Sequence, residues 1–366
     1  MKWVIHGFYG FGNFGDDLMM IEVVKNIKEI SDPKAEILLL VKDLSKIDFI
    51  LARFKNLTVK NFPKGNWNFL RLIKNYDRMV FGGGTAFHEF GQCNPYWNII
   101  AKFCGLKIYW IGLGVEEFIS YKSLFKGTLA LACCTNVCLR DLDSLNKLEK
   151  QFSWFKRKQL AADIVLLCHN PDLSSPSSQN VSNKKMVVSW GNRLTKYISN
   201  IQQDKLLDIV INHVELWVKS YSFKSVIIAD FINFRDEAAN DYIYQKIFDK
   251  LKYQAPDIVV SRNSNPNFEE KINLIKDSNF LFSARMHPFM YAKLLNKSAI
   301  CWQYASKIKS FSNLLSMKST FSLEEIAMDS NFLNKMFKRE LYDPSVVLDF
   351  RRLQKSAKEN FYSMLI

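Results

Sequence analysis

Short apolar runs alternate with longer amphipathic segments along nearly the whole chain. Residues 2–8 form the first apolar run, and residues 14–30 follow with apolar side chains at i, i+3 and i+4 spacing. This change of period predicts a strand followed by a helix. The apolar runs show no polar–apolar alternation, which is typical of parallel strands covered by helices on both faces. The pattern therefore predicts an α/β fold with parallel sheets.

The same alternation recurs through both halves of the chain. Further strands are expected at 35–41, 76–84, 106–115, 186–190, 225–230, 257–261, 279–284 and 298–303. Further helices are expected at 204–221, 236–251, 267–278 and 287–296. Residues 123–140 read as a helix and then a strand, and the apolar segment 161–169 completes the first half. No internal sequence repeat accompanies this recurrence.

A polar segment separates the two halves. Residues 169–185 are rich in Ser, Asn and Pro, and the chain of 366 residues exceeds the length at which one core usually stops growing. We expect an N-terminal Rossmann-like domain at 1–170, a linker at 171–185 and a second Rossmann-like domain at 186–340. Residues 341–366 are predicted to form a helix that packs back on the first domain. The two domains are expected to face a cleft, with the site at strand carboxyl ends.

The charge balance points to an anionic partner without identifying it. The net charge is +14 and the pI near 9.3, which favours polyanions or an anionic membrane surface, although solvated lysines alone would give the same surplus. The seven cysteines form no C-x-x-C pair and are interpreted as reduced core residues. No apolar run is long enough for a signal peptide or a membrane span. We therefore expect a cytoplasmic protein, with peripheral association at the inner membrane face left open.

A glycine-rich segment joins the first strand to the first helix. Gly7, Gly10, Gly12 and Gly15 allow positive φ angles, and the helix that follows offers free N–H groups to an anion. Gly10-x-Gly12-x-x-Gly15 matches a dinucleotide fingerprint, but the turn is too long. Asp16 and Asp17 would also repel pyrophosphate. The two acids either complement the helix dipole or provide a general base.

A second glycine run ends the strand predicted at 76–84. Gly82, Gly83 and Gly84 could turn their amides toward a ligand, and Thr85 and His88 follow with polar side chains. Gly112 and Gly114 repeat the pattern one strand later. Small residues at two neighbouring strand ends suggest that space is kept open there as the floor of a pocket.

Cations follow several predicted strands. Arg140 comes with Asp141, an arrangement that also suits a structural ion pair or a helix cap. In the second half, Arg193, Arg285 and His287 follow strands. The strand after them is followed by Tyr304 and Lys307. Because the carboxyl ends of parallel strands share one edge of a sheet, we expect these groups of the second half to gather there.

The ordered set of these motifs resembles the polysaccharide pyruvyl transferase family. It comprises "GFGNFGDD", "FGGGTAF", "LRDLDS", "ADIVLL", "ARMHPF" and "YASK", which span about four-fifths of the chain. The resemblance implies a GT-B-like protein that transfers pyruvate from phosphoenolpyruvate onto two hydroxyls of one sugar, giving a cyclic ketal and phosphate. It implies that Arg285 and His287 hold phosphoenolpyruvate, with Arg193 as a further contact. Met286 stands where leucine is usual, and "VVSWGNR" is less typical.

The chemistry of these residue types suits that reaction. Phosphoenolpyruvate carries a carboxylate and a phosphate, and arginine recognises both with rigid bidentate geometry. His287 could protonate the enol carbon or neutralise the departing phosphate, and Asp16 or Asp17 could accept a sugar proton. We expect no metal and no cofactor beyond phosphoenolpyruvate as co-substrate. The predicted substrate-binding residues are Arg285, Arg193, Lys307, Tyr304, Gly83, Gly84, Thr85, His88, Asn13 and Arg140.

Two other functions are compatible with the sequence. A GT-B glycosyltransferase would use Arg285 and Lys307 to hold the diphosphate of a nucleotide-sugar. A non-catalytic binder of nucleic acid or anionic membrane would use the net charge and residues 152–159, which mix aromatics with cations. For the transferase, we expect a sugar acceptor of a capsule or exopolysaccharide, which an undecaprenyl pyrophosphate would carry at the inner membrane face. No nucleic-acid partner is expected for it.

Overall fold

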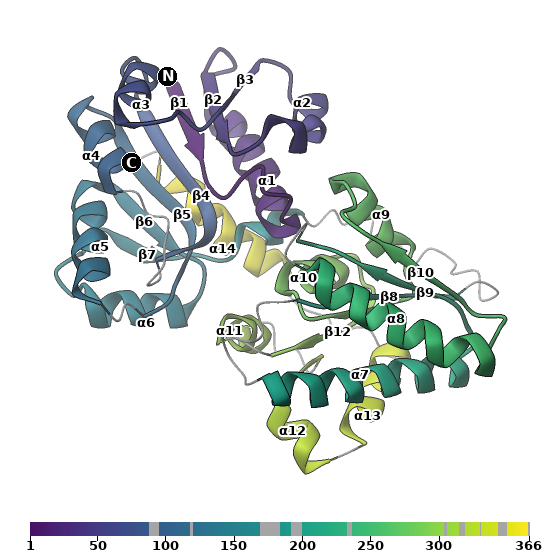
Figure 1. The fold of residues 1–366 in the computed structure, drawn as a ribbon. Coiled ribbons are helices and arrows are strands. Elements are labelled where there is room, and N and C mark those ends of the chain that lie inside the picture. The colour runs from purple at the N-terminus through teal and green to yellow at the C-terminus, as the bar shows by residue number, and fades with distance from the viewer. Residues whose placement is uncertain are drawn as a thin grey trace. The chain divides into compact units, whose positions relative to one another are not determined.

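The computed structural model describes most of the chain as two compact units (Figure 1). The described residues are 1–87, 95–117, 120–168, 184–191, 200–232, 236–303, 306–314, 319–329, 331–342 and 350–364. The first unit comprises Met1–Phe11, Gly15–Cys168 and Asp349–Ile366, and the second comprises Gly12–Phe14 and His169–Leu348. No helix in the described part of the chain has the length and apolarity needed to cross a membrane.

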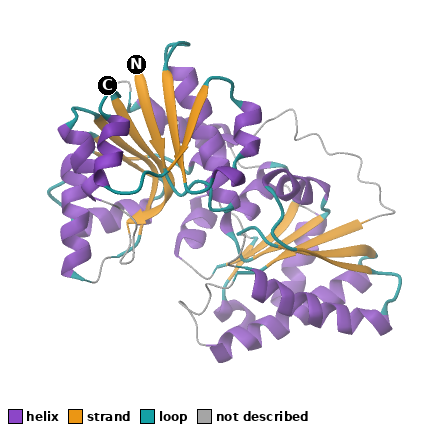
Figure 2. Cartoon of the chain, turned by 45° about the horizontal axis from the view of Figure 1, so that its top comes forward, coloured by secondary structure: helices purple, strands orange, loops and turns teal. Residues whose placement is uncertain are grey.

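The first unit is built on a parallel sheet with the strand order β3-β2-β1-β4-β5-β6-β7. Its strands are β1 (Lys2–His6), β2 (Glu36–Val41), β3 (Leu57–Asn61), β4 (Arg78–Phe87), β5 (Lys107–Val115), β6 (Asn136–Leu139) and β7 (Lys158–Leu160). Its helices are α1 (Phe14–Ile30), α2 (Asp48–Arg53), α3 (Asn66–Ile73), α4 (Pro95–Phe103), α5 (Tyr121–Cys133), α6 (Leu142–Gln151) and α14 (Phe350–Tyr362), with short 3-10 helices η1 (Leu44–Lys46) and η2 (Ile164–Cys168). Helices cover both faces of the sheet (Figure 2).

The last helix belongs to the first unit although it comes at the end of the chain. Asn360 of α14 is fully buried, and its side-chain oxygen accepts a hydrogen bond from the Gly112 amide at 2.8 Å. Its side-chain nitrogen donates to the Ala162 carbonyl at 2.9 Å. The helix therefore supplies partners to backbone groups of β5 and of the segment after β7 that burial would otherwise leave unsatisfied.

The second unit contains a parallel sheet with the strand order β10-β9-β8-β11-β12-β13. Its strands are β8 (Lys184–Ser189), β9 (Phe223–Ala229), β10 (Val259–Asn263), β11 (Phe280–Ser283), β12 (Ser298–Trp302) and β13 (Thr320–Phe321). Its helices are α7 (Asn200–Ser220), α8 (Glu237–Gln254), α9 (Phe268–Asp277), α10 (Met286–Leu294), α11 (Ser306–Leu314), α12 (Leu323–Met328) and α13 (Phe332–Tyr342).

Both sheets share one topology, which fixes where a ligand would bind. In each, the first strand lies between the second and the fourth in chain order, as in a Rossmann fold. The strand order therefore reverses between β1 and β4 in the first unit and between β8 and β11 in the second. Ligands of such sheets bind outside the carboxyl ends of the strands at this switch point. The predicted α/β fold with two Rossmann-like domains is confirmed.

Two local features of the first unit were not predicted. The glycine run was expected to close a strand at residue 84, but β4 continues through it to Phe87, with a shift of register against β5. The apolar segment 161–169, for which no type of element was predicted, contains the 3-10 helix η2 and follows β7, the last strand of the first sheet. Both segments are largely apolar and buried, and an apolar run does not by itself specify which backbone conformation a buried segment adopts.

Candidate functional site

Arg285 lies at the switch point of the second sheet. It follows β11 as the N-cap residue of α10. The Ser283 hydroxyl accepts a hydrogen bond from the Arg285 amide at 2.9 Å and donates one to the Arg285 carbonyl at 2.9 Å. The next residue toward the strand, Ala284, donates its amide to the Ser189 carbonyl of β8 at 2.8 Å. The backbone that carries Arg285 is therefore fixed between β8 and β11.

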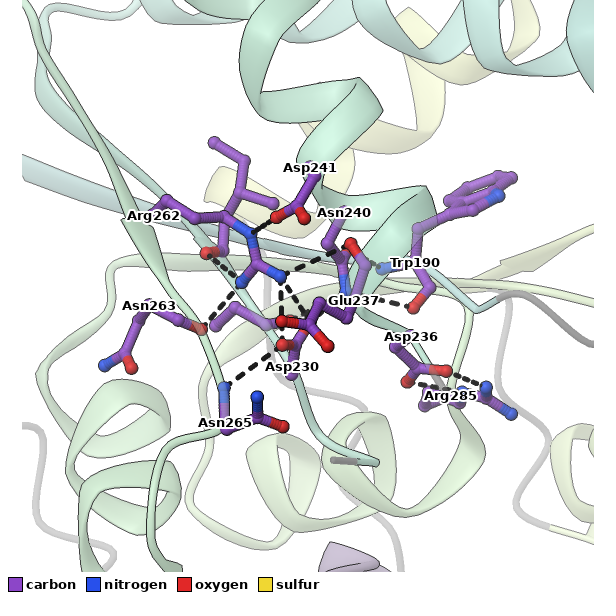
Figure 3. A network of polar contacts seen from close by, with 12 residues as sticks. Trp190, Asp230, Asp236, Glu237, Asn240, Asp241, Arg262, Asn263, Asn265 and Arg285 are labelled. Atoms are coloured by element: carbon purple, nitrogen blue, oxygen red, sulfur yellow. Dashed lines mark hydrogen bonds and ion pairs between the residues drawn. The ribbon is translucent and has the colours of Figure 1, made fainter. Parts of the chain in front are cut away.

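The Arg285 side chain forms a buried ion pair that the sequence did not predict. Its Nε donates to Asp236 Oδ2 at 3.0 Å, and one Nη donates to Asp236 Oδ1 (Figure 3). Asp236 is fully buried as the residue before α8, and Arg285 is 6% exposed. A guanidinium carries five N–H donors in one plane, and these bonds use two of them. Asp236 therefore orients the guanidinium and balances its charge within the second unit.

A glycine makes room for this arginine. A Cβ atom at Gly191, just after β8, would lie 2.7 Å from Cζ of Arg285 and 2.8 Å from its Nε. Such distances are too short for any side chain unless the guanidinium moves. Arg285 thus lies over the carboxyl end of β8 as well as that of β11.

A second buried network braces the neighbouring strand ends (Figure 3). Asp230, at the end of β9, is fully buried and accepts two bonds from one Nη of Arg262 at 2.8 and 2.9 Å. Asn240 of α8 donates to Asp230 at 2.8 Å and accepts the amide of Trp190 at 2.8 Å. These bonds tie β8, β9, β10 and α8 together, so the frame around Asp236 is rigid. The sequence did not single out Asp230 or Asp236. The pattern that could have identified them is their position, Asp230 at the end of the predicted strand 225–230 and Asp236 at the start of the predicted helix 236–251.

The first turn of α10 adds a local positive potential beside Arg285. The positive end of the helix dipole makes such a terminus a favourable place for an anion. His287 is the second residue of this helix and is half-buried. Arg285 and His287 are therefore brought to the same strand end, as the sequence predicted from their spacing.

The segment Gly12–Phe14 belongs to the second unit, whereas the whole glycine-rich segment was expected in the first domain. Asn13 pairs with Ile232 in an isolated antiparallel bridge, and the Phe14 amide donates to the Phe231 carbonyl at 3.0 Å. Lys271 of α9, which is 1% exposed, donates its Nζ to the Gly12 carbonyl at 2.8 Å.

The Phe14 ring completes this attachment. It contacts three aromatic rings of the second unit with centroids 5.4 to 5.9 Å apart, those of Phe231, Phe268 and Tyr291. Tyr291 is a residue of α10, the helix that begins after Arg285. Phe14 therefore packs against the same helix that carries His287.

Asp16 and Asp17 occupy the first turn of α1, and both side chains are buried. A Cβ atom built at Gly84 would lie 3.7 Å from a carboxylate oxygen of Asp16, so the Asp16 side chain lies close to β4 at Gly84. Burial, together with the charge of Asp16, raises the pKa of Tyr9 well above its ordinary value. The tyrosine is therefore a neutral donor, and it gives its hydroxyl hydrogen to the Gly82 carbonyl at 2.6 Å.

Side chains fill the space above the glycines of β4. Tyr9 lies against Gly82, Met19 against Gly83 and Phe8 against Gly84, each at a distance that leaves no room for a Cβ atom. Gly83 and Gly84 have φ angles of 77° and 88°, which other residues rarely adopt. Close packing therefore accounts for these glycines, and the expectation that they form the floor of a pocket stays a prediction.

Arg140 is a buried centre of the first unit. It is 5% exposed, and its guanidinium contacts Asp141 at 3.3 Å and Asp163 at 3.6 Å. One of its Nη groups donates to the Thr85 hydroxyl at 3.3 Å and would lie 2.6 Å from a Cβ atom at Gly114. Asp141 also caps α6. The structure therefore brings the predicted residues Thr85 and Arg140 together. Arg140 also forms the ion pair with Asp141, and Asp141 forms the helix cap, that the sequence left as alternatives.

Several predictions fall outside this geometry. His88, Arg193 and Tyr304 lie outside the described residues. Lys307 lies half-buried in the first turn of α11. Phe152 and Phe155 of the segment 152–159 are core residues, which leaves Trp154 as its exposed aromatic ring. Where the structure describes the chain, no group of three His, Cys, Asp or Glu side chains has the geometry of a metal site.

The fold is similar to that of solved sugar-nucleotide enzymes. UDP-GlcNAc 2-epimerase from Methanocaldococcus jannaschii has 12% identity and a TM-score of 0.67, and the match covers 100% of this chain and 99% of that one. The Neisseria meningitidis UDP-GlcNAc 2-epimerase bound to UDP-GlcNAc has 13% identity and a TM-score of 0.65 over 100% of both chains. Anabaena HepE in complex with UDP and glucose has 12% identity and a TM-score of 0.55 over 99% and 100%. These similarities establish a GT-B-like fold.

Comparison at the level of sequence identifies the family. No curated protein matches the chain. The family model described as polysaccharide pyruvyl transferase matches residues 13–306, a range that includes Asp16, Asp17, Arg285 and His287. Because this range is most of the chain, the protein belongs to the polysaccharide pyruvyl transferase family of enzymes.

Proposed function

We propose that this enzyme transfers pyruvate from phosphoenolpyruvate onto two hydroxyls of one sugar, forming a cyclic ketal and releasing phosphate. The observation that carries the proposal is Arg285 at the switch point of the second sheet, held by Asp236 beside the start of α10. A guanidinium of fixed orientation next to a helix N-terminus suits a ligand that carries both a carboxylate and a phosphate.

The proton balance of the reaction assigns roles to His287 and the acid pair. A proton reaches C3 of the enol, and one sugar oxygen attacks C2 and loses its hydrogen. Phosphate then leaves, and the second sugar oxygen closes the ring. The two hydroxyl hydrogens end on the new methyl group and on phosphate. His287 is the acid that moves a proton to C3 or to the leaving phosphate, and Asp16 or Asp17 is the base that takes a hydroxyl proton.

Other predicted residues would contact the substrates. Arg193, Tyr304, Lys307, Asn13 and His88 would contact the donor or the sugar, and no metal or further cofactor takes part. The acceptor is a sugar of a capsule or exopolysaccharide, or its precursor on a lipid pyrophosphate. An enzyme acting on that precursor works in the cytoplasm at the inner membrane face, where its net charge of +14 favours anionic headgroups.

A phosphate-release assay tests this function. The protein is incubated with phosphoenolpyruvate and a panel of free and lipid-linked saccharides, and phosphate and product mass are followed. Phosphate release that depends on the acceptor, with a product gaining a ketal-linked pyruvate, supports the proposal. Release of a nucleotide from a nucleotide-sugar, with none from phosphoenolpyruvate, would identify a glycosyltransferase instead.

The decisive variant must keep the fold. Replacing Arg285 alone removes the guanidinium that balances the buried charge of Asp236, and breaking a buried ion pair in this way typically costs about 3–5 kcal/mol. The double variant Arg285→Met and Asp236→Asn removes both charges together and is expected to fold. It should lose phosphate release by several orders of magnitude. Turnover close to that of the unmodified enzyme, in a variant with native circular dichroism, would remove Arg285 from the site.

A further inference from the structure

The outer helix layer of the first unit carries an unusual set of exposed aromatic residues. Helices α3, α4 and α5 pack side by side in this order along the sheet (Figure 1). The exposed rings on them are Trp67 (64%), Tyr96 (56%), Phe103 (90%), Tyr121 (91%) and Phe125 (64%). Single exposed apolar residues are common, but a cluster of large rings on adjacent helices marks an interaction surface.

Spacing within the helices turns these rings outward together. Tyr96 and Phe103 are seven residues apart on α4, and Tyr121 and Phe125 are four apart on α5, so each pair lies on one face of its helix. The opposite face of each helix supplies core residues, among them Ala101 and Leu131. The exposed rings therefore do not serve the core of the first unit.

The charge of this layer has one sign. Arg71, Lys102, Lys122 and Lys126 are exposed among the rings, and the guanidinium of Arg71 lies 5.5 Å from the centre of the Trp67 ring. None of the three helices contains an aspartate or a glutamate. The aromatic-basic face, defined by these five rings and four cations, is therefore complementary to an anionic surface.

We propose that the aromatic-basic face binds the surface of an anionic lipid bilayer. Amphipathic aromatic rings settle at the boundary of headgroups and acyl chains, while the flexible stems of lysines keep their charges at the phosphates. A second copy of this chain is a poorer occupant, because a symmetric dimer through this face would bring the same cations against each other. The inference rests on the proposed function in one respect, because a lipid-linked acceptor would be met at such a surface. Lipid binding itself needs neither the donor nor the acceptor.

Vesicle co-sedimentation tests the proposal. The full chain is mixed with vesicles of phosphatidylglycerol and phosphatidylcholine, or of phosphatidylcholine alone, at rising salt. We expect binding to the anionic vesicles that weakens with salt and little binding to the neutral ones. Each lysine near such a surface contributes about five-fold in affinity, so Lys122→Glu with Lys126→Glu should reduce binding by more than an order of magnitude. Phe103→Ser with Phe125→Ser should reduce it about ten-fold or more.

A matched control lies in the second unit. Tyr253 is 81% exposed on α8, with Lys252 lying 5.3 Å from its ring centre. The variant Tyr253→Ser with Lys252→Glu changes one exposed aromatic and one cation away from the face, and it should bind anionic vesicles as the unmodified protein does. Equal loss in this control would show that overall charge, not the face, drives binding and would overturn the proposal.

The other occupants give distinct results. A concentration-dependent dimer in sedimentation velocity that Phe103→Ser with Phe125→Ser abolishes, without vesicle binding, would make the face a protein interface and reject the lipid surface. Binding of a single-stranded oligonucleotide without vesicle binding would reject it equally. Phosphate release with a free saccharide is measured in parallel. Its absence from a protein that binds vesicles would count against the proposed function alone.

Discussion

Single residues at this protein's strand ends owe their identity to packing as much as to chemistry. Arg285 and Arg140 each lie over a glycine, Gly191 and Gly114, where a Cβ atom would collide with the guanidinium. Each arginine also has a buried carboxylate partner. Sequence spacing predicted the two arginines and the pair of Arg140 with Asp141, but Asp163 and Asp236 come from other segments, and their pairing was recognisable only once the chain was folded.

His6 makes stability depend on pH. It ends β1, is 8% exposed, and packs edge-on against Phe81 and Trp97. Burial lowers its pKa from 6.5 to about 4. Between these values the unfolded chain binds a proton that the native state does not, so stability falls as pH drops from about 6.5 to about 4. The loss is on the order of 3 kcal/mol.

Urea unfolding at pH 7.5 and 5 measures this effect. The variant His6→Phe should show a smaller loss of unfolding free energy over that interval than the unmodified protein does. His213, which is only half-buried, serves as the control through His213→Phe. An equal pH dependence in unmodified protein and His6→Phe would mean that His6 titrates normally.

At the scale of elements, most helices and strands follow from periodicity. The expected helix at 14–30 and the expected helix at 267–278 agree closely with α1 and α9, the latter fixed by a capping box of Asn267 and Glu270. Several short elements, among them the helix α3 and the strand β7, were not predicted, because segments this short carry little periodic signal. Attachment of Gly12–Phe14 to the second unit had no signal at all, since it depends on Lys271 and Phe231, more than two hundred residues away.

Lys271 is expected to position the glycine-rich segment. The variant Lys271→Met removes the donor to the Gly12 carbonyl, which leaves a buried acceptor unsatisfied at a cost of about 1–3 kcal/mol. If the acid pair after this segment acts in the reaction, kcat for phosphate release should fall at least ten-fold, while KM for phosphoenolpyruvate changes little. Lys276→Met, an exposed position on the same helix, is the matched control. Equal kcat in both variants would argue against a positioning role.

At the scale of the whole molecule, the two units have separate cores, although the chain crosses between them more than once. Residues 349–366 return to the first unit, where Asn360 bonds with Gly112 and Ala162. A destabilising substitution near the end of the chain should therefore lower the stability of the first unit without changing that of the second.

Asn360→Ala tests this coupling. It leaves two backbone groups of the first unit without their partner, which we expect to lower that unit's unfolding free energy by about 2–4 kcal/mol. Hydrogen exchange read by mass spectrometry should show faster exchange in β5 and η2, with unchanged exchange in β8 and β11. Asn212→Ala, on the exposed side of α7, is the control. Uniform acceleration through both units would contradict independent cores.

The sequence by itself determined the α/β class, the two Rossmann-like domains and the family, because periodicity and ordered motifs are local properties of the chain. It also placed Arg285 and His287 at a strand end. Tertiary structure alone decided that Asp236 pairs with Arg285, that side chains cover the glycines of β4, and that Gly12–Phe14 joins the second unit. Those outcomes depend on which distant segments share a buried volume, where each charge needs a partner and each cavity must be filled.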